Sequence, residues 1–222
     1  MLMIREKLGF AVRRFLISLL FLIGISIVLH GVELALVVSS GQAELSFVLL
    51  IQAIINDIVF VIDIGFYLII GYLCMYLISD FSTRMLMAFL MIIIIANQIG
   101  LMQYFLVSKM LLGVDFWSYS WNDIKLTIKA SADIKWWQIL AFPLVIGLAM
   151  RLHYTMQQHT LNLYLTLGIL AGLALLAIVS PTFTLDGVAQ KNLATSKAHY
   201  FLTKTKEYYA QRSNDDGGKG AN

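Results

Sequence analysis

Long apolar stretches alternate with short polar turns along most of the chain. The apolar stretches cover residues 15–38, 55–78, 85–107, 138–155 and 160–180. A helix needs about 20 apolar residues to cross the hydrocarbon core of a bilayer. The pattern therefore predicts an all-α integral membrane protein in which residues 1–180 form a domain of five transmembrane helices.

One long polar break, residues 108–137, separates the third apolar stretch from the fourth. It contains all four tryptophans of the chain. Tryptophan and tyrosine favour the headgroup level of a bilayer, where the ring is half buried and its polar edge stays hydrated. We therefore interpret 108–137 as an interfacial loop on the outer face. Asn122 or Ser120 could cap a short amphipathic surface helix there, whereas the residue pattern by itself favours a structural elbow between two helices.

The side chains of this loop are the predicted contacts to the membrane surface. A lysine near an anionic membrane surface contributes about 1 kcal/mol of attraction. The candidate headgroup contacts are Trp117, Tyr119, Trp121, Lys125, Lys129, Lys135, Trp136 and Trp137. Membrane lipids are accordingly the first expected partner.

Polar residues inside the apolar stretches form a second set of candidates. Such residues usually face the interior of a helix bundle or water, because they are costly in lipid. The candidate intramembrane residues are Asn56, Asp63, Asn97 and Gln98. Asp57 falls near the outer end of its helix and is expected to need no special role. Its spacing from Asp63 turns the two carboxylates to different sides of the helix.

The histidines have no spacing that predicts a metal site. His30 and Glu33 lie near the far end of the first helix, where we expect them to reach the interface. His153 and His159 fall in a polar turn and are interpreted as solvated loop residues. The single cysteine, Cys74, cannot form an internal disulfide, and no Cys/His cluster has zinc spacing. We therefore assign no catalytic residue, metal ligand or cofactor to this chain.

Residues 181–222 follow the fifth apolar stretch as a polar tail. Pro181 ends the preceding helix. Residues 192–212 mix lysines with aromatic residues, as in a juxtamembrane helix at a membrane surface or at the edge of another domain. The last ten residues are polar and glycine-rich and are predicted to be disordered.

The composition agrees with a membrane protein. Hydrophobic residues make up 59% of the chain and the mean hydropathy is +0.80, whereas soluble domains contain roughly 45–50% apolar residues. The formal net charge is only +3. Basic anchors beside anionic lipid explain a charge of this size better than nucleic-acid binding does. Nucleic acid is therefore not an expected partner.

The distribution of charge predicts the orientation. A basic segment, residues 5–14, precedes an apolar stretch that is longer than the roughly 7–15-residue core of a signal peptide. We interpret it as an uncleaved first helix with a cytoplasmic N-terminus, which also places Arg84 and Arg151 inside. Five crossings then put the tail outside. The lysines of 108–137 fall outside as well, and they weaken the charge argument.

Two segments resemble a known family. They are YFLVSKMLLGVDFWSYSWNDIKLTIKAS at residues 104–131 and KNLATSKAHYFLTKTKEYY at residues 191–209. Both resemble the membrane part of lipoteichoic-acid-synthase-like proteins, which are membrane-anchored members of the alkaline phosphatase and sulfatase superfamily. In that family five N-terminal helices carry an extracytoplasmic hydrolase or phosphotransferase domain. The resemblance implies a multi-pass protein of the bacterial cytoplasmic (inner) membrane that serves the cell envelope.

The catalytic residues of that family have no counterpart in this sequence. The family's chemistry uses a threonine or similar nucleophile beside a divalent metal such as manganese, held by carboxylates and histidines of the extracytoplasmic domain. The threonines of the tail have no metal-binding partner near them in the sequence. The resemblance therefore implies the N-terminal membrane region of such a protein without its catalytic domain. The chain alone is expected to show no manganese-dependent phosphodiesterase or sulfatase turnover.

Two functions follow as hypotheses. The resemblance implies a membrane-anchoring module of a phosphoglycerol transferase or sulfatase-type hydrolase, which would hold an extracytoplasmic catalytic domain or partner chain and present a lipid-linked substrate to it. The alternative is a self-sufficient small membrane protein, either a scaffold subunit or a transporter, in which the intramembrane polar residues line a path. A transporter is the less favoured form, because no inverted repeat or broken helix is evident in the sequence.

Overall fold

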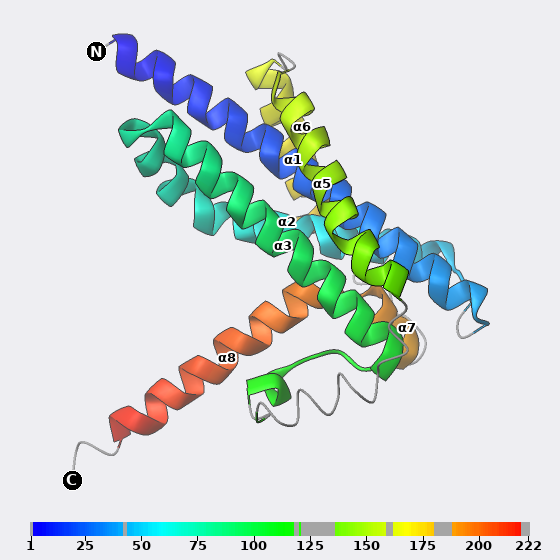
Figure 1. Cartoon of the computed structure of the whole chain (residues 1–222). Coiled ribbons are helices and arrows are strands. Elements are labelled where there is room, and N and C mark those ends of the chain that lie inside the picture. Colours follow the sequence, from blue (N-terminus) through cyan, green and yellow to red (C-terminus); the bar gives the residue numbers. More distant parts are fainter. Residues whose placement is uncertain are drawn as a thin grey trace.

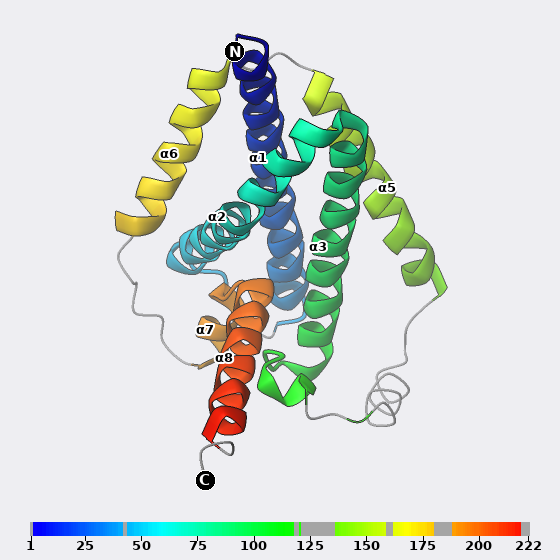
Figure 2. The same ribbon diagram turned by 90° about the vertical axis from the view of Figure 1, so that its left-hand side faces the viewer.

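The computed structural model describes residues 2–41, 44–117, 120, 136–158, 162–179 and 188–218. Its helices are α1 (Leu2–Ser39), α2 (Phe47–Ile78), α3 (Asp80–Ser108), the 3-10 helix η1 (Val114–Trp117), α5 (Trp136–Gln158), α6 (Leu163–Val179), α7 (Val188–Ala194) and α8 (Lys197–Gly218). No strand occurs in these residues, so the predicted all-α class is confirmed for them. Helices α1, α3 and α6 run in one direction and α2 and α5 in the opposite one (Figures 1 and 2).

Three of the described helices are long and apolar enough to cross a membrane. They are Lys7–Ser39 within α1, Phe47–Ile78 and Asp80–Ser108. Helix α6 contributes a shorter apolar stretch, Leu163–Leu175, and α5 carries Pro143 within it. Length and composition thus indicate a membrane protein, whereas the five predicted crossings are not all established.

Helix α1 lies at the centre of the bundle. It packs against α2, α3, α5 and α6, and Figure 2 shows α5 and α6 on its opposite sides. Phe15 and Leu22 of α1 belong to the main hydrophobic core, together with Phe60 of α2 and Met91 of α3. Because lipid tails are as apolar as these side chains, close packing rather than water exclusion holds such helices together.

A glycine allows α2 to approach α1 closely. A Cβ atom at Gly65 would lie 2.7 Å from Cδ2 of Leu19 on α1. A Cβ atom at Gly71, on the same helix, would have no heavy atom of the neighbouring structure within 4 Å. The packing therefore requires a small residue at position 65 and not at position 71.

One residue joins α2 to α3. Ser79 has an extended backbone, with φ −156° and ψ 120°, and its side chain caps α3 by accepting the backbone N–H of Ser82 at 3.3 Å. The next residue, Asp80, lies in the first turn of α3, where a negative charge interacts favourably with the helix dipole. Its carboxylate binds Arg14 of α1 and Arg84, each at 2.6 Å. These charges fasten the turn to α1.

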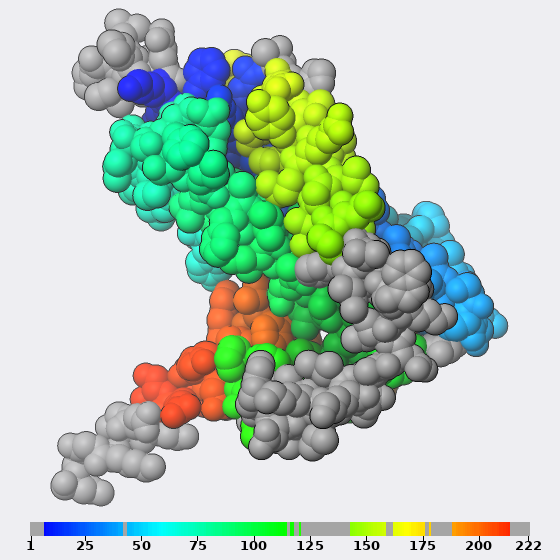
Figure 3. All heavy atoms as spheres, in the orientation of Figure 1, coloured from blue at the N-terminus to red at the C-terminus, as the bar shows by residue number. Residues whose placement is uncertain are grey.

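The tail forms two helices where the sequence predicts one. The predicted helix 192–212 is interrupted at Thr195 and Ser196, between α7 and α8. The chain turns there so that Ser196 and Lys197 become buried against the bundle. Helix α8 then continues to Gly218. Figure 3 shows the start of α8 (orange) lodged against α3 (green), with its later part extending away.

Candidate functional site

The elbow between α7 and α8, residues 193–197, is capped by side chains of the long helices. Leu193 and Ala194 are almost fully buried, and the carbonyls in the last turn of a helix have no partner within that helix. His30 of α1 donates from Nε2 to the Leu193 carbonyl at 2.7 Å. Asn56 of α2 donates from Nδ2 to the Ala194 carbonyl at 2.7 Å. Helix α7 therefore ends inside the bundle with both of these carbonyls hydrogen-bonded.

Lys197 brings a buried charge to the elbow. Its ammonium lies 2.5 Å from Oε1 of Glu33 on α1, donates to the Leu193 carbonyl at 3.0 Å and lies 4.5 Å from the centre of the Phe105 ring. Oε1 of Glu33 has no hydrogen-bond partner of good geometry among the described residues. Its contact with Lys197 is therefore mainly an electrostatic attraction. Burial lowers the pKa of the Lys197 amine from its ordinary value, and the charge of Glu33 opposes that shift.

Beside this ion pair, His30 binds a second carboxylate. Its Nδ1 lies 2.8 Å from Oδ2 of Asp57 on α2. His30 is 7% exposed and Asp57 is 4% exposed. Buried ionisable groups are tolerated when they are paired and hydrogen-bonded. One histidine thus links three helices, because it contacts α2 through one ring nitrogen and α7 through the other.

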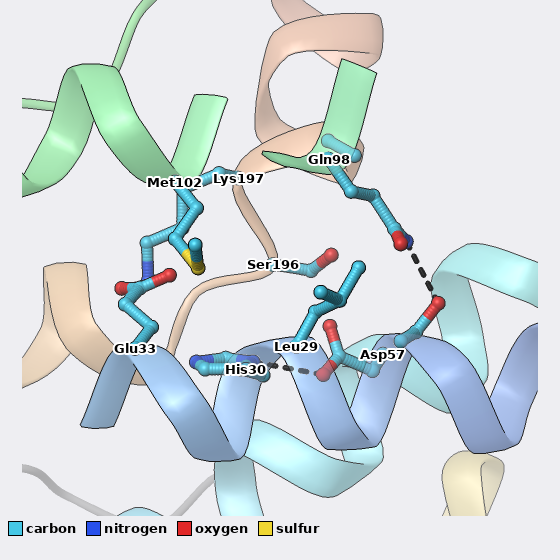
Figure 4. A pocket seen from close by; sticks show the side chains of 10 residues that line it. Leu29, His30, Glu33, Asp57, Gln98, Met102, Ser196 and Lys197 are labelled. Atoms are coloured by element: carbon cyan, nitrogen blue, oxygen red, sulfur yellow. Dashed lines mark hydrogen bonds and ion pairs between the residues drawn. The ribbon is translucent and has the colours of Figure 1, made fainter. Parts of the chain in front are cut away.

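These groups surround a small cavity (Figure 4). Its volume is about 30 Å³, which is room for about one or two water molecules. Gln98 of α3 closes one side by donating to the Ser26 hydroxyl at 2.7 Å, while its own Oε1 is buried without a hydrogen-bond partner among the described residues. The cavity is also lined by Leu29, Met102, Ser196 and Ala198.

Helix α8 also contacts the middle of α2. Nε2 of His199 lies 3.2 Å from Oδ2 of Asp63. The Lys206 ammonium lies 4.3 Å from the centre of the Tyr67 ring. These contacts are more exposed than those of the elbow, so each contributes less to stability. They nevertheless fix the direction in which α8 leaves the bundle.

The 3-10 helix η1 holds α8 from another side. Nε1 of Trp117 donates to the Thr205 hydroxyl at 3.1 Å. The Trp117 ring stacks on Phe201 at a centroid distance of 6.1 Å, and Phe116 meets the same ring edge-on at 5.5 Å. The start of the predicted interfacial loop is therefore an aromatic support for α8.

The structure reverses the expected roles of the two aspartates of α2. Asp57 is buried and bound to His30, whereas the Asp63 side chain is 54% exposed and faces His199. The expectation for Asp57 is wrong because the elbow covers that end of α2 and excludes solvent from it. The two carboxylates do point to different sides of the helix, as their spacing predicts.

The expectation that His30 and Glu33 reach the interface is also wrong. Both are buried under the elbow. Of the predicted intramembrane residues, Asn56 and Gln98 belong to the site, while Asn97 is half-buried and does not line the cavity. The available sequence signal was the clustering of polar residues in three apolar stretches, but it did not indicate that the tail would pair with them.

His153 differs from its predicted place as well. It belongs to α5, is 6% exposed, and its Nε2 lies 2.9 Å from the Ser18 hydroxyl of α1. Its ring also packs against Phe21. Helix α5 continues to Gln158, so His153 lies on a helix, faces the bundle and is not a solvated loop residue.

Most predicted headgroup contacts fall outside the described residues. These are Tyr119, Trp121, Lys125, Lys129 and Lys135, and His159 of the next turn falls outside them as well. Trp136 and Trp137 begin α5, where the structure describes only their backbone. Trp117 is partly exposed and contacts α8.

The chemistry available at this site is ion pairing and proton exchange. Within the described ranges no group of three or more His, Cys, Asp and Glu side chains converges as metal ligands would. The cavity brings together an imidazole, two carboxylates and an ammonium. Comparisons of the chain with protein-family models, curated proteins and solved structures found no match.

Proposed function

We propose that the chain is a membrane-anchoring module that fixes the juxtamembrane helix α8 at one end of a helix bundle. In that position α8 would hold an extramembrane domain or a partner chain beside the bilayer. The observation that carries the proposal is the capping of α7 by His30 and Asn56 inside the bundle. A tail that only followed the last helix would need no buried polar partners.

The energetics of the elbow support a fixed position for α8. Polar and charged groups within apolar helices are costly unless they are paired. Here Glu33 is paired with Lys197, and both His30 and Asn56 bind carbonyls of α7. The bundle therefore needs the tail to satisfy its own buried groups. This dependence favours a single arrangement of the two parts.

Contacts from three elements support the same conclusion. Lys197 connects α8 to α1, His199 connects it to α2, and Thr205 connects it to η1. A helix held at three points along its first turns transmits its orientation to whatever follows it. Anchoring is therefore favoured over a flexible tether.

We further propose a specific family for the enzyme that this module anchors. The module would belong to a lipoteichoic-acid-synthase-like phosphoglycerol transferase or sulfatase-type hydrolase. The N-terminus would then be cytoplasmic and α8 would lie on the outer face of a bacterial inner membrane. Any divalent metal, such as manganese, would belong to the catalytic domain that α8 supports. The sequence resemblance of residues 104–131 and 191–209 supports this form. The described parts of these two segments also pack together through Trp117 and Thr205.

The alternative of a small transporter has less support. Asn56 and Gln98, two residues of its predicted path, instead hold the elbow and line a small cavity of about 30 Å³. Asp63 faces His199 on α8 and does not line the cavity. A scaffold subunit that binds a partner through α8 remains compatible with anchoring, because both require the helix to be fixed.

The test is a distance measurement between the bundle and α8 in the full chain. Spin labels are placed at two exposed positions, Gln103 of α3 and Gln211 of α8, in a Cys74→Ser background because Cys74 is free and exposed. In lipid nanodiscs, pulsed electron double resonance should give one narrow distance distribution. A distribution that is broad at every pH for this otherwise wild-type chain would overturn the proposal.

A matched pair of variants assigns the effect to the elbow. Asn56→Leu removes the donor to the Ala194 carbonyl, and leaving such a group unpaired costs about 1–3 kcal/mol. We expect this variant to broaden the distribution. Asn97→Leu changes a half-buried amide that does not line the cavity, and it should leave the distribution narrow.

A further inference from the structure

The His30 ring lies between two hydrogen-bond acceptors. Nε2 faces the Leu193 carbonyl at 2.7 Å and Nδ1 faces the Asp57 carboxyl at 2.8 Å. A carbonyl oxygen can only accept, so Nε2 must carry a hydrogen. The contact between Nδ1 and Oδ2 needs another hydrogen, either on the ring or on the carboxyl. The two contacts together therefore require two hydrogens.

A neutral imidazole beside an ionised carboxylate supplies only one hydrogen. The observed arrangement thus holds one additional proton, as an imidazolium beside a carboxylate or as a neutral imidazole beside a carboxylic acid. Either form has no net charge. Since both groups are buried, a neutral pair is far less costly than the same pair carrying a net negative charge.

We propose that His30 and Asp57 form a proton-binding site that locks the elbow to the bundle. When the shared proton passes to water, the pair acquires a charge of −1 and keeps one ring hydrogen. That hydrogen goes to the stronger acceptor, the Asp57 carboxylate. The lone pair of Nε2 then faces the Leu193 carbonyl. His30 then no longer caps α7. Lys197 of α8 still donates to the same carbonyl, but the elbow has lost its hydrogen bond to α1 and its attachment to the bundle is weakened.

The surrounding charges do not replace the missing proton. Glu33 of α1 and Lys197 of α8 face the same cavity and neutralise each other as an ion pair. Gln98 of α3 and Asn56 of α2 are neutral amides. His199 and Asp63 form a separate pair on the exposed side of α2. The proton shared by His30 and Asp57 is therefore the one that keeps this cluster neutral.

The experiment uses the label pair at Gln103 and Gln211 and raises the pH in steps. The range from about pH 5 to about pH 10 includes the ordinary titration of histidine and approaches that of lysine. We expect the narrow distance peak to be lost reversibly as the pH rises. A peak that stays narrow throughout would overturn the proton site.

Two substitutions at Asp57 make the result specific. Asp57→Asn can donate an amide hydrogen to Nδ1 permanently, so the same network forms without an exchangeable proton, and the peak should stay narrow at every pH. Asp57→Ala removes the carboxylate that competes for the ring hydrogen, so a neutral His30 keeps that hydrogen on Nε2 for the Leu193 carbonyl, and the peak should not broaden as the pH rises. If Asp57→Asn shows the wild-type transition, another group such as Lys197 loses the proton, and the proposal is wrong.

This inference rests on the proposed anchoring of α8, but the two fail in different ways. Broad distances in the unsubstituted site at every pH would contradict anchoring itself. Narrow distances at every pH would leave anchoring intact and contradict only the proton site. Nitrogen-15 shifts of the His30 ring give a second measurement, because the proposal requires a hydrogen on Nε2 whenever the peak is narrow.

Discussion

Nζ of Lys197 on α8 lies 2.5 Å from Oε1 of Glu33 on α1, and each side chain is less than a tenth exposed. They are the buried ion pair that joins the tail to the central helix. Breaking such a pair on one side leaves an uncompensated charge and costs about 3–5 kcal/mol, whereas replacing both partners by neutral groups is often tolerated.

We therefore expect Glu33→Gln and Lys197→Met each to lower thermal stability strongly, and the double variant to be more stable than the less stable single one. Thermal unfolding in detergent, analysed as a double-mutant cycle, measures the coupling. Additive losses would show that the two side chains do not interact in the folded protein.

The thermal stability of the Glu33→Gln variant should change with pH in a direction that can be predicted. Burial lowers the pKa of Lys197, and removing Glu33 removes the charge that opposes this shift. A base with a lowered folded pKa destabilises the protein below that pKa, and stability is regained as pH rises from it towards the ordinary value near 10.4. In an Asp57→Asn background, which removes the proton that His30 shares with Asp57, Glu33→Gln should therefore unfold at higher temperature as the pH is raised. A fall instead would contradict the assignment.

Gly65 should be much more sensitive to substitution than Gly71. Valine at position 65 would force the buried Leu19 side chain of α1 to move, since even a Cβ there lies 2.7 Å from Cδ2 of Leu19. Overpacking of this kind typically costs about 1–3 kcal/mol. Gly71→Val on the same helix meets open space and serves as the control. Equal losses of thermal stability would contradict the close approach of α2 to α1.

Trp117 should slow hydrogen–deuterium exchange of the backbone amides of α8. Trp117→Ala removes the hydrogen bond to Thr205 and the stacking on Phe201. Aromatic pairs contribute about 0.5–1.5 kcal/mol beyond burial. We expect faster hydrogen–deuterium exchange in the part of α8 around Thr205, while α6 exchanges as before. Thr205→Val, which loses only the hydrogen bond, should give a smaller increase.

The ion pairs of Asp80 should contribute only modestly to the thermal stability of the protein. It binds Arg14 and Arg84 at 2.6 Å each, but all three side chains are a quarter or more exposed. Exposed ion pairs contribute about 0–1 kcal/mol. Asp80→Asn should therefore lower thermal stability only slightly and become indistinguishable from wild type at high salt. A loss comparable to that of Glu33→Gln would show that this end of the bundle is less hydrated than its exposure indicates.

The sequence by itself determined the three long apolar helices and the turns between them. The apolar stretches at 15–38, 55–78 and 85–107 fall within α1, α2 and α3, because helix length and hydrophobicity are local properties. The serines that cap α2 and α3, Ser46 and Ser79, are likewise readable from the chain.

Only the tertiary structure decided which polar residues form the site. The partners of His30 lie 27 and 163 positions away in the sequence, and no local periodicity carries that information. Asp57 is buried because the elbow covers it, and the elbow bends there because α1 and α2 offer donors to its free carbonyls. Burial and pairing are properties of the assembled helices, so they could not be assigned until those helices were placed together.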